Sequence, residues 1–329
     1  MKKPWKWIMI IGLGLICLIA VLLLSGVAYQ FISSKIDENA YPPPGKLVDV
    51  GGYRLHINCT GKGGPSVILD SGLGGNSLEW SLVQPEVAKF THVCSYDRAG
   101  QGWSEESPLA RTSQSIVDEL HILLHEAEIP EPYILVGHSS GGINMRLYAS
   151  RYPNEVAGMV LVDSAHEDQL QKMPITLPNK TTELFLNYIG YNRIRIFQYL
   201  NQIKESLKPF PHDIQEMYLT RMRTTRFNRT ALEELFNLEE STKQLKNAGG
   251  FLGDKPLIVI TAGKNPYNEE TGESLESLSK EDRILKDLQK DLVSKSTNGK
   301  QIFAEHSGHM ITREQPEIIV EAIREVIAQ

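Results

Sequence analysis

Strand-like and helix-like segments alternate along most of this 329-residue chain, and this alternation constrains its fold more than any other feature. Short apolar runs typical of buried strands are followed by segments with apolar residues at helical spacing. Parallel strands need crossover helices, so the order predicts an α/β fold with a mostly parallel sheet covered by helices on both faces. The expected strands are 46–50, 53–59, 66–70, 92–96, 133–136, 159–162, 257–260 and 301–304, and the expected helices are 80–90, 113–127, 142–151, 279–292 and 316–327.

The same pattern divides the chain into three parts. Residues 1–32 form an apolar segment, residues 33–45 look like a linker with Tyr41-Pro42-Pro43-Pro44-Gly45, and residues 46–329 form the body. Within the body, the strand pattern is interrupted from about 165 to 247, where apolar and aromatic residues have helical spacing. An insertion of this size is too long for a loop, so it predicts a helical lid on the sheet.

The first part has the composition of a membrane helix. Lys2, Lys3 and Lys6 precede a stretch from 7 to 34 without a charged residue. A helix of about 20 apolar residues crosses the hydrocarbon core of a bilayer, and flanking lysines favour the cytoplasmic side. The sequence therefore predicts a single-pass anchor in the cell membrane, with the lipid bilayer as a partner and the body on the extracytoplasmic side. The alternative is a secreted protein whose signal peptide is cleaved near Gly26-Val27-Ala28.

Composition and motifs exclude several classes of function. The net charge is −6, and basic residues are nowhere concentrated enough to indicate a nucleic-acid partner. The sequence contains neither a cluster with metal-ligand spacing nor a phosphate-binding loop. We therefore expect no nucleic acid, no metal and no cofactor.

One expected strand runs directly into a serine flanked by glycines. The apolar run 133–136 is followed by Gly137-His138-Ser139-Ser140-Gly141, after which helical spacing begins. A strand–turn–helix of this kind exposes the serine hydroxyl at the sheet edge, and the glycines are needed because a Cβ would clash in the tight turn. The motif alone is a weak signal, but its placement predicts that Ser139 is a nucleophile.

Four segments in order give the body a resemblance to the α/β-hydrolase family, in its serine esterase and lipase-like branch. They are Asp70-Ser71-Gly72-Leu73-Gly74-Gly75, Tyr96-Asp97-Arg98-Ala99-Gly100-Gln101-Gly102-Trp103-Ser104, the serine motif, and Ser307-Gly308-His309. The first resembles the family's oxyanion loop, which implies that the backbone N–H groups of Leu73 and Ser140 bind an oxyanion. The second resembles a structural turn, so no catalytic role is expected for Asp97 or Arg98. Serine at the turn distinguishes the chain from the dehalogenase and epoxide-hydrolase branches, which use aspartate.

The resemblance also implies a histidine base and a carboxylate that orients it. His309 follows the last expected strand and matches the family's Gly-His signature, whereas its neighbour His306 lacks the preceding glycine. In most relatives the acid follows the seventh strand, where this chain has no aspartate. In other relatives it follows the sixth strand, and Asp163 stands at that place here. Glu269 and Glu270, a few residues beyond the seventh strand, are the alternatives.

These roles predict a hydrolase that cleaves an ester or related acyl bond in a small molecule. Ser139 would attack a carbonyl while His309 takes its proton, and water would then release the acyl-enzyme. Two other functions stay open. One is an aminopeptidase-type serine hydrolase. The other is a non-catalytic ligand-binding or signalling protein that keeps the fold and binds its ligand under the lid, which the missing aspartate after the seventh strand favours.

The cysteines bear on the compartment. In the family fold the second and fourth strands are neighbours in the sheet, and here Cys59 ends the second expected strand while Cys94 lies in the fourth. The resemblance therefore implies a disulfide between them, which would fit an exported body. Two buried free thiols are the alternative. Cys17 lies within the apolar segment.

Overall fold

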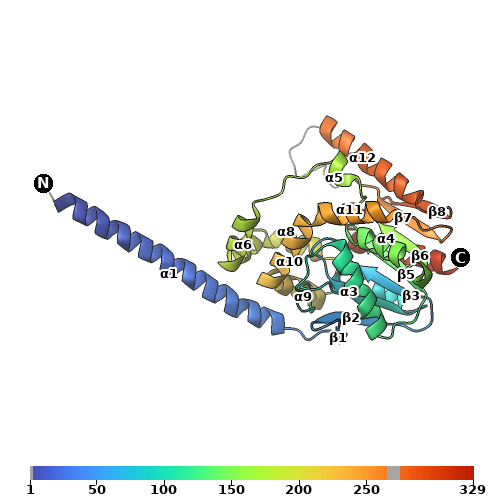
Figure 1. Ribbon diagram of the computed structural model, residues 1–329, viewed down its shortest axis with the longest axis horizontal. Coiled ribbons are helices and arrows are strands. Elements are labelled where there is room, and N and C mark those ends of the chain that lie inside the picture. Colours follow the sequence, from blue (N-terminus) through green and yellow to red (C-terminus); the bar gives the residue numbers. More distant parts are fainter. Residues whose placement is uncertain (1–2, 265–274) are drawn as a thin grey trace.

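The computed structural model describes residues 3–264 and 275–329, and the body has three layers with a sheet in the middle (Figure 1). The eight strands are ordered β1-β2-β4-β3-β5-β6-β7-β8. β1 pairs with β2 and β2 with β4 in antiparallel fashion, and all further neighbours are parallel. The expected mostly parallel α/β sheet is thus confirmed. The strands are β1 (Lys46–Asp49), β2 (Arg54–Thr60), β3 (Ser66–Asp70), β4 (Val93–Tyr96), β5 (Tyr133–His138), β6 (Val156–Val162), β7 (Leu257–Ala262) and β8 (Gly299–Ala304).

Two hydrophobic cores lie on the two faces of the sheet. One lies under α3 (Ser113–Glu126), α4 (Gly141–Arg151) and α12 (Leu275–Val293), and the other under α2 (Gln84–Val87) and α14 (Pro316–Ile327). Every residue of the central strands β3 and β5 is buried. Burial on both faces explains why these strands are continuous apolar runs instead of alternating patterns.

The helix expected over 80–90 is two shorter pieces. A 3₁₀ turn covers Ser77–Trp80, and α2 begins four residues later. Pro85 lies in the first turn of α2. Because proline has no N–H to donate to the preceding turn, a single helix cannot run through this point, and a new helix starts there.

The segment between β6 and β7 is helical, as expected for the lid. Its last helix, α11, packs against α3 and α4, so it also completes the helical layer of the body. The helices are α5 (Gln169–Lys172), α6 (Lys180–Tyr188), α7 (Tyr191–Gln198), α8 (Leu200–Leu207), α9 (His212–Met222), α10 (Thr225–Phe236) and α11 (Leu238–Ala248).

The N-terminal segment is one continuous helix, α1 (Lys3–Asn39), whose first half projects away from the body (Figure 1). From Trp5 it is long and apolar enough to cross a membrane. The helix continues through residues 33–39, which the sequence assigned to a linker. No glycine or proline occurs there before Pro42, and contacts with the lid hold this end of the helix in place. Only the stretch between Asn39 and the start of β1 at Lys46 is non-helical.

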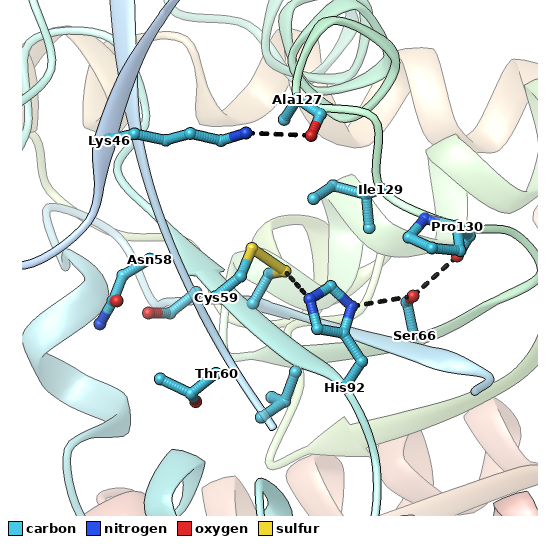
Figure 2. Close-up of a disulfide and its surroundings, with 12 residues drawn as sticks. Lys46, Asn58, Cys59, Thr60, Ser66, His92, Ala127, Ile129 and Pro130 are labelled. Carbon is cyan, nitrogen blue, oxygen red and sulfur yellow. Dashed lines mark hydrogen bonds between the residues drawn. A yellow bond between two sulfur atoms is a disulfide. The ribbon is translucent and has the colours of Figure 1, made fainter. Parts of the chain in front are cut away.

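A disulfide joins Cys59 and Cys94, with 4.1 Å between their Cα atoms. The two residues are direct partners in the antiparallel ladder of β2 and β4. Figure 2 shows His92 beside the bond, with its Nε2 3.9 Å from the Cys94 sulfur. The disulfide expected between the second and fourth strands is therefore confirmed, and free thiols at these positions are excluded.

Candidate active site

Ser139 occupies the turn between β5 and α4, with a φ of +52° that non-glycine residues rarely adopt. The flanking glycines make this turn possible. A Cβ on Gly137 would lie 2.6 Å from the Gly142 Cα, and one on Gly141 would lie 2.5 Å from the Asp70 carbonyl oxygen. Both distances are shorter than any tolerated contact, so Gly137 allows α4 to begin close to β5, and Gly141 allows α4 to lie close to the end of β3. The strained turn expected from the sequence is present.

His309 and Asp163 meet although 146 positions separate them in the chain. His309 follows β8, Asp163 follows β6, and the His309 Nδ1 lies 2.6 Å from the Asp163 Oδ2. The other carboxylate oxygen accepts a hydrogen bond from the Ala262 N–H at 3.1 Å. Asp163 also has a positive φ of +39°. Its carboxylate is therefore fixed between the β7 backbone and the imidazole.

These two residues and Ser139 line one cavity of about 320 Å³. Part of its wall comes from α12, through Asp282, Leu285, Lys286 and Gln289. His306 is exposed and is not part of this lining, and its N–H binds the Gln315 side chain at 2.7 Å. The alternative acids Glu269 and Glu270 lie outside the described residues. The structure thus brings together Ser139, His309 and Asp163.

The two N–H groups expected to bind an oxyanion have no acceptor within the described part of the chain. In the same loop the N–H groups beside Leu73 are engaged: that of Gly72 by Glu79 at 3.3 Å and that of Gly74 by Glu234 at 2.9 Å. Leu73 and Ser140 line one small cavity together. This cavity is distinct from the one that Ser139 lines.

Arg98 holds the loop that carries Leu73. Its guanidinium donates to the carbonyl oxygens of Ser71 at 2.8 Å and Gly72 at 2.6 Å. It also pairs with Asp70 at 2.7 Å and with Glu234 of α10 at 2.9 Å. Burial opposes the positive charge, but these carboxylates outweigh it and raise the pKa of Arg98. Arg98 therefore fixes the backbone of this loop through hydrogen bonds, in keeping with the structural role expected for it.

A buried ion pair between Glu79 and His138 connects the loop that carries Leu73 to the backbone of His309. Glu79 lies 2.5 Å from the Nδ1 of His138, and His138 Nε2 donates to the His309 carbonyl oxygen at 2.9 Å. Burial opposes both charges, yet the pair outweighs it, so the pKa of His138 is raised and the pKa of Glu79 is lowered. The sequence indicated no role for His138 beyond its place in the serine motif, and none for Glu79. The only available signal was a polar histidine inside a buried turn, which needs a partner.

Potential metal ligands lie elsewhere. Among the described residues, side chains that could hold a metal ion together form two groups, and neither lines the cavity. One consists of His92 with the two disulfide cysteines, whose sulfurs are bonded to each other. The other consists of His121, His125 and Glu155.

Comparison with known sequences gives the same family over most of the chain. The model of the α/β hydrolase fold family matches residues 65–311. The uncharacterized protein YqjL of Bacillus subtilis is 26% identical over 282 residues, which are 85% of this chain and 91% of that protein. A probable transporter, efuK of Hormonema carpetanum, is 27% identical over 86% of this chain, but the match spans only 42% of that longer protein.

Solved structures agree on the fold. An epoxide hydrolase, CorEH, superposes with a TM-score of 0.62 and 19% identity, over 86% of this chain and 98% of its own. A thermophilic esterase from Thermogutta terrifontis gives 0.58 and 18%, over 86% and 97%. Together with the family match over residues 65–311, the sheet order and the serine turn, these similarities establish that the chain belongs to the α/β-hydrolase family.

Proposed function

We propose that this protein is a membrane-anchored serine hydrolase that cleaves an ester or related acyl bond in a small molecule. The observation that carries the proposal is the 2.6 Å hydrogen bond between His309 and Asp163 at a cavity that Ser139 also lines. A nucleophile, a base and an acid that orients the base are the parts needed for acyl transfer. Hydrolases with this fold include esterases and epoxide hydrolases among the similar structures, and serine as the nucleophile favours acyl transfer.

In this mechanism Asp163 keeps the proton of His309 on Nδ1, so that Nε2 accepts the proton of the Ser139 hydroxyl. The Ser139 oxygen attacks the carbonyl carbon, and the N–H groups of Leu73 and Ser140 stabilise the negative charge on the carbonyl oxygen. The protonated His309 then gives its proton to the leaving group. An acyl-enzyme remains, and His309 removes a proton from the water molecule that releases the acid.

Asp163 is the acid that we assign. Its position after β6, the backbone hydrogen bond from Ala262 and the contact with His309 support this choice. Because a carboxylate already binds Nδ1 of the histidine, a second one from beyond β7 is not required. The chain then needs no aspartate after the seventh strand, and the main reason for a purely binding function disappears.

The membrane anchor is part of the same proposal. The apolar α1, the lysines that precede its charge-free stretch and the disulfide in the body support a retained helix with the body on the extracytoplasmic side. Cleavage near Ala28 would cut α1 beside the point where Gly26 packs against the lid at Ile189. The mass of the membrane-extracted protein tests this, because a retained anchor keeps Met1 whereas cleavage leaves a chain that starts near residue 29.

The catalytic part is tested with a fluorophosphonate probe on the full chain in detergent micelles. We expect the wild type to gain one phosphonyl group on Ser139, seen by intact mass and peptide mapping, and the Ser139→Ala variant to gain none. Ser206→Ala, which removes an exposed lid hydroxyl, is the matched control and should label like the wild type. A folded wild type that never reacts would contradict the proposal and favour the binding function.

A further inference from the structure

Outside α1, the exposed large apolar side chains are concentrated in one stretch of the lid sequence. Outside α1, eight of the twelve large apolar side chains that are exposed in the described chain fall between Ile175 and Tyr199. The eight are Ile175, Leu177, Phe185, Tyr188, Tyr191, Ile194, Phe197 and Tyr199. Ile175 and Leu177 line a separate pocket against α10 and α11, so we give the name apolar lid face to the members on α7, Tyr191, Ile194 and Phe197. An exposed group of this kind on a protein surface marks a contact with a partner or a membrane.

Helix α7 shows that this exposure is organised. Asn192 and Ile196 point inward and are buried, whereas Tyr191, Ile194 and Phe197, at three-residue spacing, are exposed. The exposed fractions of the Ile194 and Phe197 side chains are 53% and 76%. A surface helix in water normally has a polar outer face, so this exposed apolar row, which has Arg195 and Gln198 beside it, is suited to an apolar surrounding.

The turn before α7 and the Arg193 side chain of α7 contact α1. The turn before α7 approaches so closely that a Cβ on Gly26 would lie 2.8 Å from the Ile189 carbonyl oxygen. Gln30 of α1 is buried and its side chain donates to the Arg223 carbonyl oxygen at 3.0 Å and accepts from Arg193 at 2.7 Å. These hydrogen bonds fix the position of the lid along the axis of α1, close to residues 26–30.

This position along α1 corresponds to the surface of the bilayer that α1 would cross. The charge-free stretch of α1 begins at Trp7, and about 20 helical residues cross the hydrocarbon core, so the crossing ends near Gly26. Ile194 and Phe197 line a groove of about 650 Å³ together with Ser25, Gly26 and Tyr29. The apolar lid face therefore lies level with the outer boundary of the membrane that α1 would cross.

The charge of this region fits the same partner. Residues 175–208 contain five basic and two acidic side chains, although the whole chain has a net charge of −6. Tyrosine and phenylalanine side chains are favourable at the boundary between hydrocarbon and headgroups, and basic residues attract anionic phospholipids.

We propose that the apolar lid face is seated in the outer interfacial layer of the same bilayer that α1 crosses, with phospholipid as its partner. This rests on the membrane anchoring proposed above. The lid is then held between the body and the lipid surface, so the hydrolase has a fixed orientation on the membrane instead of moving freely on a flexible tether.

The experiment uses the full chain in vesicles of phosphatidylcholine with a minor share of phosphatidylglycerol. Cys17→Ser removes the free thiol, and single bimane probes are attached through Phe197→Cys on the lid, Phe303→Cys on β8 as the matched exposed control, and Val21→Cys within α1. Lipids with a spin label near the headgroup or deeper in the acyl chain quench probes that lie in the bilayer. Phe303 matches Phe197 because both side chains are exposed. Thermal unfolding of each variant verifies that it is folded.

We expect the headgroup-proximal spin label to quench the Phe197 probe at least about twofold, as for a side chain in the interface, and to leave the Phe303 probe unchanged. Quenching at Val21 alone would overturn the docking of the lid and leave the anchor standing. No quenching at Val21 would overturn the anchor, and the docking with it. A Phe197 probe that is shielded from water but not quenched by lipid would identify a second copy of the chain as the partner and also overturn the proposal.

Discussion

The body and the lid bury their apolar residues in opposite ways. Leu69, Leu135 and Val160 in the central strands are completely inaccessible to water. In the lid, by contrast, Phe197 is 76% exposed, and the separate hydrophobic cluster of the described lid residues is built around Leu207, Phe210 and Leu219. The body is therefore stabilised by its own hydrophobic core, whereas the lid depends on what lies beside it.

The neighbour on which the lid depends is α1, as the contacts between the two show. They are largely polar: Gln30 binds Arg193, Arg223 and Thr225, and Asp37 pairs with Arg193 at 2.6 Å. Such contacts fix a position but add less stability than a packed core. Ser139, His309 and Asp163 at the sheet edge should therefore tolerate changes in α6 and α7, whereas these two helices should respond to changes in α1.

The largest expected effect is chemical and confined to the body. Asp163→Asn keeps the size of the side chain but removes the charge that stabilises protonated His309, so kcat for hydrolysis of a short acyl ester should fall about 10⁴-fold. Thermal unfolding should change little, which separates loss of chemistry from loss of fold. Glu269→Gln is the matched control with the same change of charge. A larger loss in the control would show that the acid comes from beyond β7.

The next effect concerns the stability of the body. Removing the disulfide with Cys59→Ser and Cys94→Ser together should lower the free energy of unfolding by about 3–4 kcal/mol, because the bond closes a loop with a sequence separation of 35. Urea unfolding of the full chain in detergent measures it. Reductant should destabilise the wild type similarly and leave the double variant unchanged, and Cys17→Ser should have no effect. Equal stability of the double variant and the wild type would contradict this prediction.

A smaller effect with a clear pH dependence is expected from the buried pair beside the site. His138 has a raised pKa in the folded protein. Its contribution to the free energy of unfolding is therefore complete below its ordinary pKa of 6.5 and is lost as the pH rises through the raised pKa. Glu79 has a lowered pKa, so its contribution is complete above its ordinary value of 4.5 and is lost as the pH falls through the lowered value. Glu79→Gln should therefore cost about 1–3 kcal/mol between pH 4.5 and 6.5, and less at alkaline pH.

Urea unfolding at several pH values measures the difference between this variant and the wild type. Glu86→Gln, on an exposed side chain of the same region, is the matched control and should give a flat difference near zero. A difference for Glu79→Gln that does not decrease toward alkaline pH would show that His138 is neutral in the folded protein.

The smallest expected effect is local and belongs to the lid. Gln30→Ala removes the buried amide that joins α1 to Arg193 and Arg223. The free energy needed to separate the lid locally from α1 should fall by about 1–2 kcal/mol. Hydrogen exchange of the peptides that cover α6 and α7 should accelerate about 5- to 30-fold, while the peptides of β5 and β6 keep their protection. Ile32→Ala, on the exposed side of α1, is the matched control. Equal acceleration in the body would remove the distinction between the two regions.

Much of the fold could be predicted because it depends on local patterns. The central strands are buried on both faces and therefore appear as apolar runs, and Gly137 and Gly141 are required by one tight turn. Helix ends were less predictable. Pro85 divides the helix expected over 80–90, and contacts with the lid extend α1 to Asn39, past the boundary placed at residue 32.

Neighbouring residues encode the strand–helix alternation, the turn at Ser139, the histidine after the last strand and the apolar N-terminal segment, so these features could be recognised from the chain alone. Which residues become partners depends on the tertiary fold. It joined Asp163 to His309 and Glu79 to His138, and it set the lid against α1 at Gln30. The physical reason is that such pairs form where the ends of parallel strands converge or where distant helices pack, and no local spacing in the chain records these distances.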